Sequence, residues 1–174
     1  MKKRILQILM AMALLAATAV AAFADGQVVI TGGSLSQIPQ NIGFTATLTG
    51  LAQTVNDNDS TNWTATDPTG TGTGWNITIL ATDFVSGGNT IAVSNFKVKL
   101  DAGNIATVDG NTAPTSSITA YTSLTGTAQK LLSAAVNAGM GDYTYVPDFS
   151  LDLAADVFAG TYDSTVTVAV VSGP

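Results

Sequence analysis

Apolar and polar residues alternate along four stretches of the chain, and this alternation is its clearest structural signal. The stretches cover residues 44–49, 75–79, 149–153 and 165–170, with an apolar side chain at every second position. A period of two is typical of β-strands that bury one face and expose the other. Clusters of Gly, Asn, Asp, Ser and Thr separate the stretches, as expected for turns. The pattern predicts an all-β protein, an antiparallel β-sandwich of an Ig-like or jelly-roll-like kind.

Residues 127–141 fit this pattern less clearly, because their Ala and Leu residues favour helix. The segment is short and ends in two glycines, so we expect a strand there, or at most about one or two helical turns. Over residues 26–172 we expect roughly seven to ten strands. The core is expected to include Phe44, Leu48, Trp75, Ile77, Ile79, Phe96, Phe149, Leu151, Val166 and Val168.

The first 24 residues have the organisation of a secretory signal peptide. Three basic residues, at positions 2–4, precede an apolar stretch from Ile5 to Phe23, and small residues lie at positions 22 and 24. We expect cleavage after Ala24, which leaves residues 25–174 as a single domain. The sequence therefore predicts a secreted protein, located at the cell surface or outside the cell.

The chain expected after cleavage is acidic and lacks most reactive side chains. Three lysines remain against twelve aspartates, a net charge of −9, which excludes nucleic acid as a partner. The absence of His and Cys excludes ordinary zinc and copper sites, catalytic triads and disulfides. The aspartates lie mostly in turns or on outward strand positions, where a carboxyl group stays ionised and cannot serve as a glycosidase acid. We expect no enzymatic activity and no cofactor.

The acidic turn at residues 56–62 is a candidate metal site. Asp57, Asp59 and Asn62 offer the oxygen ligands that Ca²⁺ prefers. The turn lacks the internal glycine and the closing glutamate of an EF-hand, and its residues form turns readily without a metal. A solvated turn is therefore the favoured interpretation, and a calcium site is the alternative.

A run of glycine and threonine leads into a tryptophan at position 75. We expect the alternate glycines of residues 70–74 to adopt positive φ, where a β-carbon would clash. Trp75 shares its strand phase with Ile77 and Ile79, which favours a core residue over a platform for a ligand. Trp63 has a weaker alternation around it and is expected to be an exposed aromatic residue.

Three blocks of sequence, at residues 63–84, 139–153 and 158–174, resemble WxL-domain surface proteins of bacteria. The best-defined block, DPTGTGTGWNI, has the pattern D-x-x-G-x-G-x-G-W-x-[VI]. This pattern is matched by Asp67, Gly70, Gly72, Gly74, Trp75 and Ile77. Residue 77 is Ile where the family motif has Leu, and the terminal strand lacks a second W-x-L. The resemblance implies an exported β-sandwich that associates non-covalently with the cell envelope, through wall polysaccharide or other surface proteins, with adhesion as the role of some members.

The terminal strand predicts a second class of function. Residues 165–171 alternate and contain none of the Lys or Pro residues that usually protect an edge strand. Such a strand could complete the sheet of a neighbouring copy and build a filament, and the mature N-terminal segment DGQVVITGG is a second possible donor. Pairing within its own domain is the favoured interpretation. The leading function is thus a structural or adhesion protein of the cell surface; the alternatives are a strand-exchanged filament subunit and a calcium-dependent carbohydrate-binding module.

Overall fold

The computed structural model describes residues 27–57 and 61–174 and is all-β, as predicted. The expected signal peptide, residues 1–24, lies outside the described residues. Residues 31–174 form one compact unit. Residues 27–30 belong to a separate N-terminal unit, where they form no strand and are exposed. No helix of the described ranges is long and apolar enough to cross a membrane.

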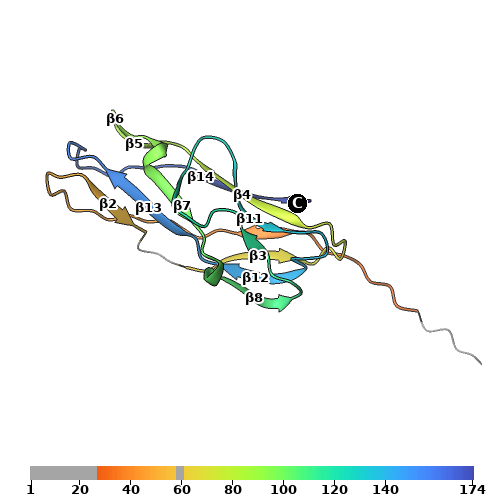
Figure 1. The fold of residues 1–174 in the computed structure, drawn as a ribbon. Helices are drawn as coiled ribbons and strands as arrows, with labels where there is room; N and C mark the ends of the chain where they lie inside the picture. The colour runs from red at the N-terminus through yellow and green to blue at the C-terminus, as the bar shows by residue number, and fades with distance from the viewer. Residues whose placement is uncertain (1–26, 58–60) are drawn as a thin grey trace, which may run out of the picture. The chain divides into compact units, whose positions relative to one another are not determined.

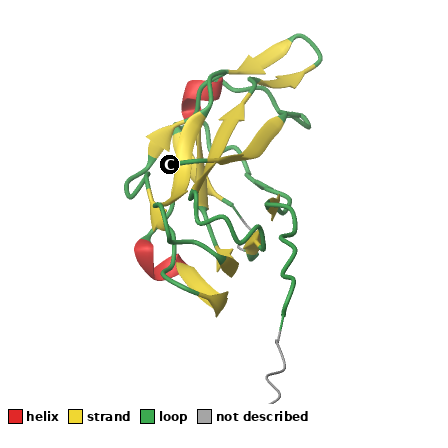
Figure 2. Cartoon of the chain, turned by 90° about the vertical axis from the view of Figure 1, so that its right-hand side faces the viewer, coloured by secondary structure: helices red, strands yellow, loops and turns green. Residues whose placement is uncertain are grey.

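The described part of the chain contains fourteen strands and two short 3-10 helices, more elements than predicted. In chain order these are β1 (Ser36–Ile38), β2 (Gln53–Asn56), β3 (Trp63–Asp67), β4 (Trp75–Ala81), β5 (Phe84–Ser86), β6 (Asn89–Ile91), η1 (Val93–Asn95), β7 (Phe96–Lys99), η2 (Ala102–Asn104), β8 (Ile105–Gly110), β9 (Thr115–Ser116), β10 (Thr122–Ser123), β11 (Gln129–Ala134), β12 (Gly141–Tyr145), β13 (Asp148–Leu153) and β14 (Val166–Ser172). Segment 127–141 forms the predicted strand, β11, and no helix. Figure 2 shows how the strands dominate the unit.

The strands form three four-stranded antiparallel sheets and one hairpin (Figure 1). Sheet A has the order β1-β3-β12-β8, sheet B the order β10-β7-β13-β2, and sheet C the order β14-β4-β11-β9. The hairpin is β5-β6. Buried side chains from sheets A, B and C belong to one continuous core. The arrangement is the predicted antiparallel β-sandwich.

Sheets A and B are built mainly from the same three stretches of chain, and each stretch contributes one strand to each sheet. This division explains why there are more strands than predicted. β12 continues into β13 across Val146 and Pro147, while β3 and β2 pair on one side and β8 and β7 on the other. Pro147 cannot donate a ladder hydrogen bond, so pairing stops there. Beside it, Asn104 of η2 accepts a hydrogen bond from the Val146 N–H and donates one to the Val146 carbonyl through its side chain. The predicted strand at residues 149–153 is therefore β13, and β12 precedes it as a separate strand.

The predicted strand at residues 44–49 does not form. Leu48, expected in the core, is 43% exposed, and Phe44 is only half-buried. The segment runs beside β2, but side chains take the place of a backbone ladder: the Gln53 amide donates to the Thr47 carbonyl, and Asp57 Oδ1 accepts from the Gly43 N–H. The sequence of this segment has the pattern of a strand, but none of the described strands forms a backbone ladder with it.

The other predicted core residues lie in or against the core. Trp75, Ile77, Ile79 and Phe96 are fully buried, and the apolar positions of β13 are at most 8% exposed. The inward-facing valines of β14 are half-buried and pack against the same core, because β14 is an edge strand of sheet C.

Candidate functional site

The glycine and threonine run forms the loop between β3 and β4, residues 68–74, here named the GT loop. Its glycines have φ of +68°, +64° and +74°, as predicted. A β-carbon on Gly74 would lie 2.5 Å from the Ala134 carbonyl oxygen, and one on Gly72 would lie 2.9 Å from an asparagine side chain. A β-carbon on Gly70 would meet no described atom within 4 Å. The loop is therefore packed tightly at its end nearest to β4.

We expect Gly74→Ala to destabilise the protein much more than Gly70→Ala. Both residues need a left-handed backbone, which costs an alanine about 1–2 kcal/mol. Gly74→Ala adds a clash with backbone atoms, which raises the expected loss to about 3 kcal/mol or more. Urea unfolding of the two variants measures the difference. Equal losses would contradict the tight packing at Gly74.

A row of hydroxyl groups follows the GT loop. Asp67, only 4% exposed, accepts hydrogen bonds on Oδ1 from the N–H (3.0 Å) and the hydroxyl (2.6 Å) of Thr69. The hydroxyl oxygens of Thr69, Thr71, Thr73 and Ser172 then follow one another at 3.0, 3.2 and 3.0 Å. Thr71, Thr73 and Ser172 are exposed. This hydroxyl row offers uncharged donors and acceptors to a ligand in solvent.

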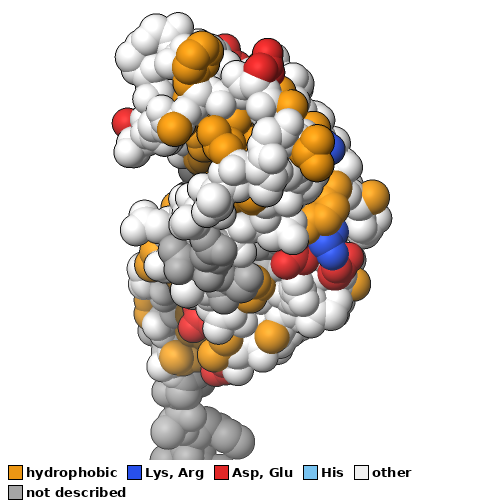
Figure 3. All heavy atoms as spheres, turned by 90° about the vertical axis from the view of Figure 1, so that its left-hand side faces the viewer, with side chains coloured by type: hydrophobic (Ala, Val, Ile, Leu, Met, Phe, Trp, Pro, Cys, Tyr) orange, Lys and Arg blue, Asp and Glu red, His pale blue; other side chains and the backbone are white. Residues whose placement is uncertain are grey.

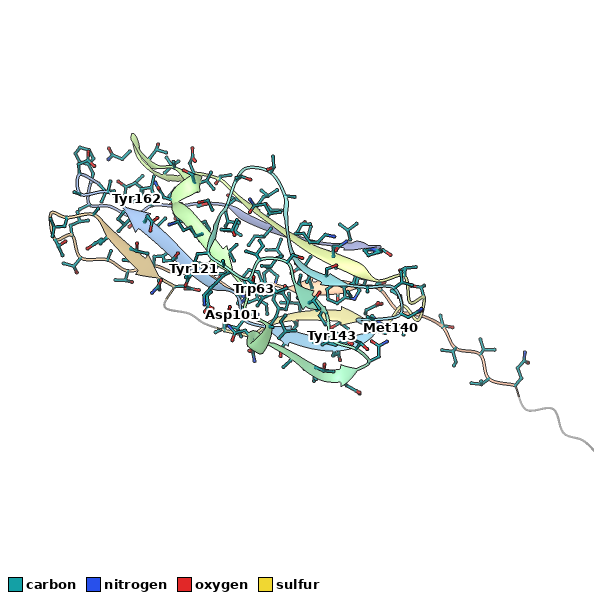
Figure 4. The ribbon with its side chains drawn as sticks, in the orientation of Figure 1. Trp63, Asp101, Tyr121, Met140, Tyr143 and Tyr162 are labelled. Atoms are coloured by element: carbon teal, nitrogen blue, oxygen red, sulfur yellow. The ribbon has the colours of Figure 1, made fainter. Side chains whose placement is uncertain are left out.

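Trp75 anchors the loop from inside and is fully buried, as predicted. Its indole N–H donates to the Gly139 carbonyl at 2.9 Å. Its ring lies 6.4 Å from that of Tyr143, whose hydroxyl donates to the Met140 carbonyl at 2.9 Å. Burial raises the pKa of Tyr143. Figure 4 shows Met140 and Tyr143 together at this end of the unit. The motif tryptophan is a core residue that links the end of the GT loop to the loop between β11 and β12.

Trp63 is 2% exposed, so the expectation of an exposed aromatic residue is wrong. β3 buries Trp63, Ala65 and Asp67 on one face. The aspartate at the third inward position obscures the apolar alternation in the sequence. The Trp63 ring lies 5.8 Å from Tyr145 and 5.7 Å from Phe149. Figure 4 shows Trp63 in the middle of the unit.

The described residues include two of the three candidate calcium ligands, Asp57 and Asn62. Asp57 Oδ1 accepts a hydrogen bond from the Gly43 N–H at 3.0 Å, and Asn62 is exposed. Asp59 lies outside the described residues. Within 27–57 and 61–174 no group of three His, Cys, Asp or Glu residues could hold a metal ion. The calcium site stays a prediction.

Lysines on the outward face of β7 are neutralised within the domain. Lys97 contacts Asp152, and the Lys99 ammonium lies 2.7 Å from Asp101 and 3.3 Å from Asp148. The hydrogen bond from Lys97 lowers the pKa of Asp152, and the hydrogen bond to Asp101 raises the pKa of Lys99. These paired charges do not form a surface for polyanions.

A groove of about 640 Å³ lies at the other end of the unit, a size typical of ligand sites. Its floor includes inward-facing residues of sheet B, Val55, Leu151 and Leu153, and its rim includes Phe158, which is 67% exposed. None of the described residues that line it is charged. Figure 3 faces this end and shows hydrophobic side chains gathered in the upper half of the view, and Figure 4 places Tyr162 there. Sequence reasoning missed this groove, although the unpaired alternation at residues 44–49 borders it.

Comparison with known proteins gives one informative match. The family model described as WxL domain, surface cell wall-binding, matches residues 26–172. Comparisons with curated proteins and with solved structures find no match. The match covers the whole β-sandwich, including the GT loop, Trp75 and β14.

Proposed function

The chain belongs to the WxL family of surface cell wall-binding domains, and from this membership we propose that it is a non-enzymatic protein held at the cell envelope without a covalent bond. The observation that carries the proposal is the family match over residues 26–172. The chain contains no His and no Cys, which removes the usual nucleophile and base pairs. Its function at the cell surface is therefore binding, with a structural or adhesive role as the proposed consequence.

The hydroxyl row is the surface that we propose for contact with wall polysaccharide. Thr71, Thr73 and Ser172 are exposed, uncharged and held in position by the tightly packed loop beneath them. Sugar hydroxyls can replace water as their hydrogen-bond partners. An acidic protein gains nothing from charge attraction to acidic wall polymers, so such binding would persist at high salt.

Co-sedimentation with purified cell walls tests this proposal. We expect the exported protein to sediment with walls at both low and high salt, and Thr71→Val/Thr73→Val to lose about tenfold in affinity, equivalent to 1.4 kcal/mol. Thr107→Val/Thr119→Val, two exposed threonines of other segments, is the matched control and should bind as the parent does. Equal binding by both double variants would refute the hydroxyl row, and no binding by the parent would refute wall association.

The calcium-dependent alternative makes a different prediction in the same experiment. If Ca²⁺ bridges protein and glycan, a chelator should release the protein from walls, and Asp57→Ala/Asp59→Ala should remove the heat of Ca²⁺ binding in calorimetry. The hydroxyl-row proposal expects binding that a chelator leaves unchanged.

A further inference from the structure

The groove is a place where the sandwich core stays open. Leu151 and Leu153 are 5% and 8% exposed at its floor, Phe44 is half-buried, and Phe158 at its rim is 67% exposed. Aliphatic and aromatic side chains dominate the lining, and the described lining residues include no Asn, Gln, Asp, Lys or Arg side chain. A glycan would find few side-chain hydrogen-bond partners here, whereas the apolar side chains of a polypeptide would be buried.

One wall of the groove also has backbone N–H and C=O groups that are available for pairing with a bound polypeptide. Residues 44–46 have the alternating sequence of a strand, yet their N–H and C=O groups have no hydrogen bond in the described structure. Backbone groups that pair with an added strand provide affinity, while its alternate side chains fill pockets. A segment with the alternation of a strand, beside an open groove lined mainly by apolar side chains, has the features of an acceptor for an extended polypeptide.

The N-terminal segment of the same chain has the matching properties. Val28, Val29 and Ile30 are 79%, 80% and 87% exposed, and residues 27–30 make no hydrogen bond in the structure. β-branched residues favour extended strands. The first backbone hydrogen bond after them is donated by the Gly33 N–H to the Pro68 carbonyl, at 2.8 Å.

We propose that residues 27–30 of one copy bind as an added strand in the groove of a second copy, beside residues 44–46. The contact joins two different surfaces, so it is heterologous and leaves one free segment and one free groove on every pair. Further copies add in the same way and build filaments or closed rings. This goes beyond wall binding, because it needs no wall component.

The charges of the chain predict how salt acts on this assembly. The segment and the described groove lining are uncharged, but each exported copy carries a net charge of −9. Salt screens the repulsion between copies and leaves the apolar contact intact. Assembly is therefore expected to strengthen as salt rises.

Sedimentation velocity of the exported protein, purified without cell walls, tests the proposal. We expect oligomers that grow with protein concentration and with salt. Val28→Asp/Ile30→Asp removes the donor segment, and Phe158→Asp places a charge at the groove rim; each should weaken assembly by about tenfold or more. Val108→Asp/Val136→Asp changes two exposed apolar residues of other segments and should assemble as the parent does. All the changed side chains are exposed, and circular dichroism checks that each variant is folded.

A mixture of the Val28→Asp/Ile30→Asp variant (the donor variant) and the Phe158→Asp variant (the groove variant) tests the heterologous contact most stringently. The donor variant retains a groove and the groove variant retains a donor, so an equal mixture should form dimers and grow no further. A peptide of sequence QVVITGG should bind the donor variant and fail to bind Phe158→Asp. A parent that stays monomeric at high concentration and high salt, or a donor variant that assembles like the parent, would overturn the proposal. Displacement of the peptide by soluble wall glycan would instead assign the groove to polysaccharide and also overturn it.

Discussion

A chain shortened by residues 164–174 is expected to remain unfolded. β14 pairs with β4 along all seven of its residues and supplies three half-buried valines to the core. The segment beyond it is also fixed, because the Gly173 N–H donates to the Gly74 carbonyl at 2.8 Å and Asn76 donates to the Gly173 carbonyl at 2.6 Å. Removal of residues 164–174 exposes one side of β4 and leaves the buried Asn76 without its partner at Gly173. The expected loss in the free energy of unfolding is comparable with the whole stability of a domain, about 5–15 kcal/mol.

Far-ultraviolet circular dichroism and gel filtration of the shortened chain measure this effect. The Gln37 side chain, which donates to the Val168 carbonyl at 3.1 Å, already occupies part of the outer edge of β14. β14 is paired within its own domain in this structure, which agrees with the favoured interpretation of the sequence. A shortened chain that folds as a monomer and no longer assembles would contradict this and would indicate exchange of the terminal strand between copies.

Trp75→Ala is expected to lower the free energy of unfolding by about 3–5 kcal/mol, the usual loss for a large buried aromatic residue. The side chain is fully buried, and its indole donates to the Gly139 carbonyl at 2.9 Å. Collapse around the cavity is limited, because Gly139 adopts φ of +70° and already approaches the indole closely.

Trp75→Phe is the control for this loss. It keeps most of the apolar volume and removes the hydrogen bond, so the expected loss is about 1–3 kcal/mol from the unpaired carbonyl. Thermal and urea unfolding of the three proteins measure both values. Parent-like stability of Trp75→Ala would show that the tryptophan is not part of the core.

Local sequence patterns predicted the fold class and the structure of the GT loop. The alternate glycines require positive φ, and the phase of Trp75 with Ile77 places it inside, so both features follow from residues close together in the chain. The signal for β11 was also local, because the two glycines after it end any helix.

Features that depend on partners far apart in the chain could not be read in the same way. Trp63 is buried by Tyr145 and Phe149, and an inward Asp67 conceals its strand phase. Residues 44–49 have the pattern of a strand, but no local rule shows that pairing fails. Residues of this unpaired segment line the groove, so the sequence alone could not locate it.

The defining residues of the family motif are therefore different from the residues proposed to make contact, although the threonines of the hydroxyl row lie in the same loop. The motif glycines and Trp75 fix the shape of a loop, and the threonines between the glycines present their hydroxyls outward. The groove lies at the other end of the unit (Figure 4) and is proposed to bind a second copy. If the hydroxyl row binds the wall, the groove at the other end of the unit is left free to bind a second copy.

Tryptophan fluorescence can show whether the motif tryptophan belongs to the core and stays out of contact with the wall. The chain has two tryptophans, and they are 2% and 0% exposed, so the emission reports only these positions. We predict blue-shifted emission that acrylamide quenches weakly and that does not change when soluble wall glycan binds. Emission typical of tryptophan in water, or a shift that follows glycan binding, would contradict the claim.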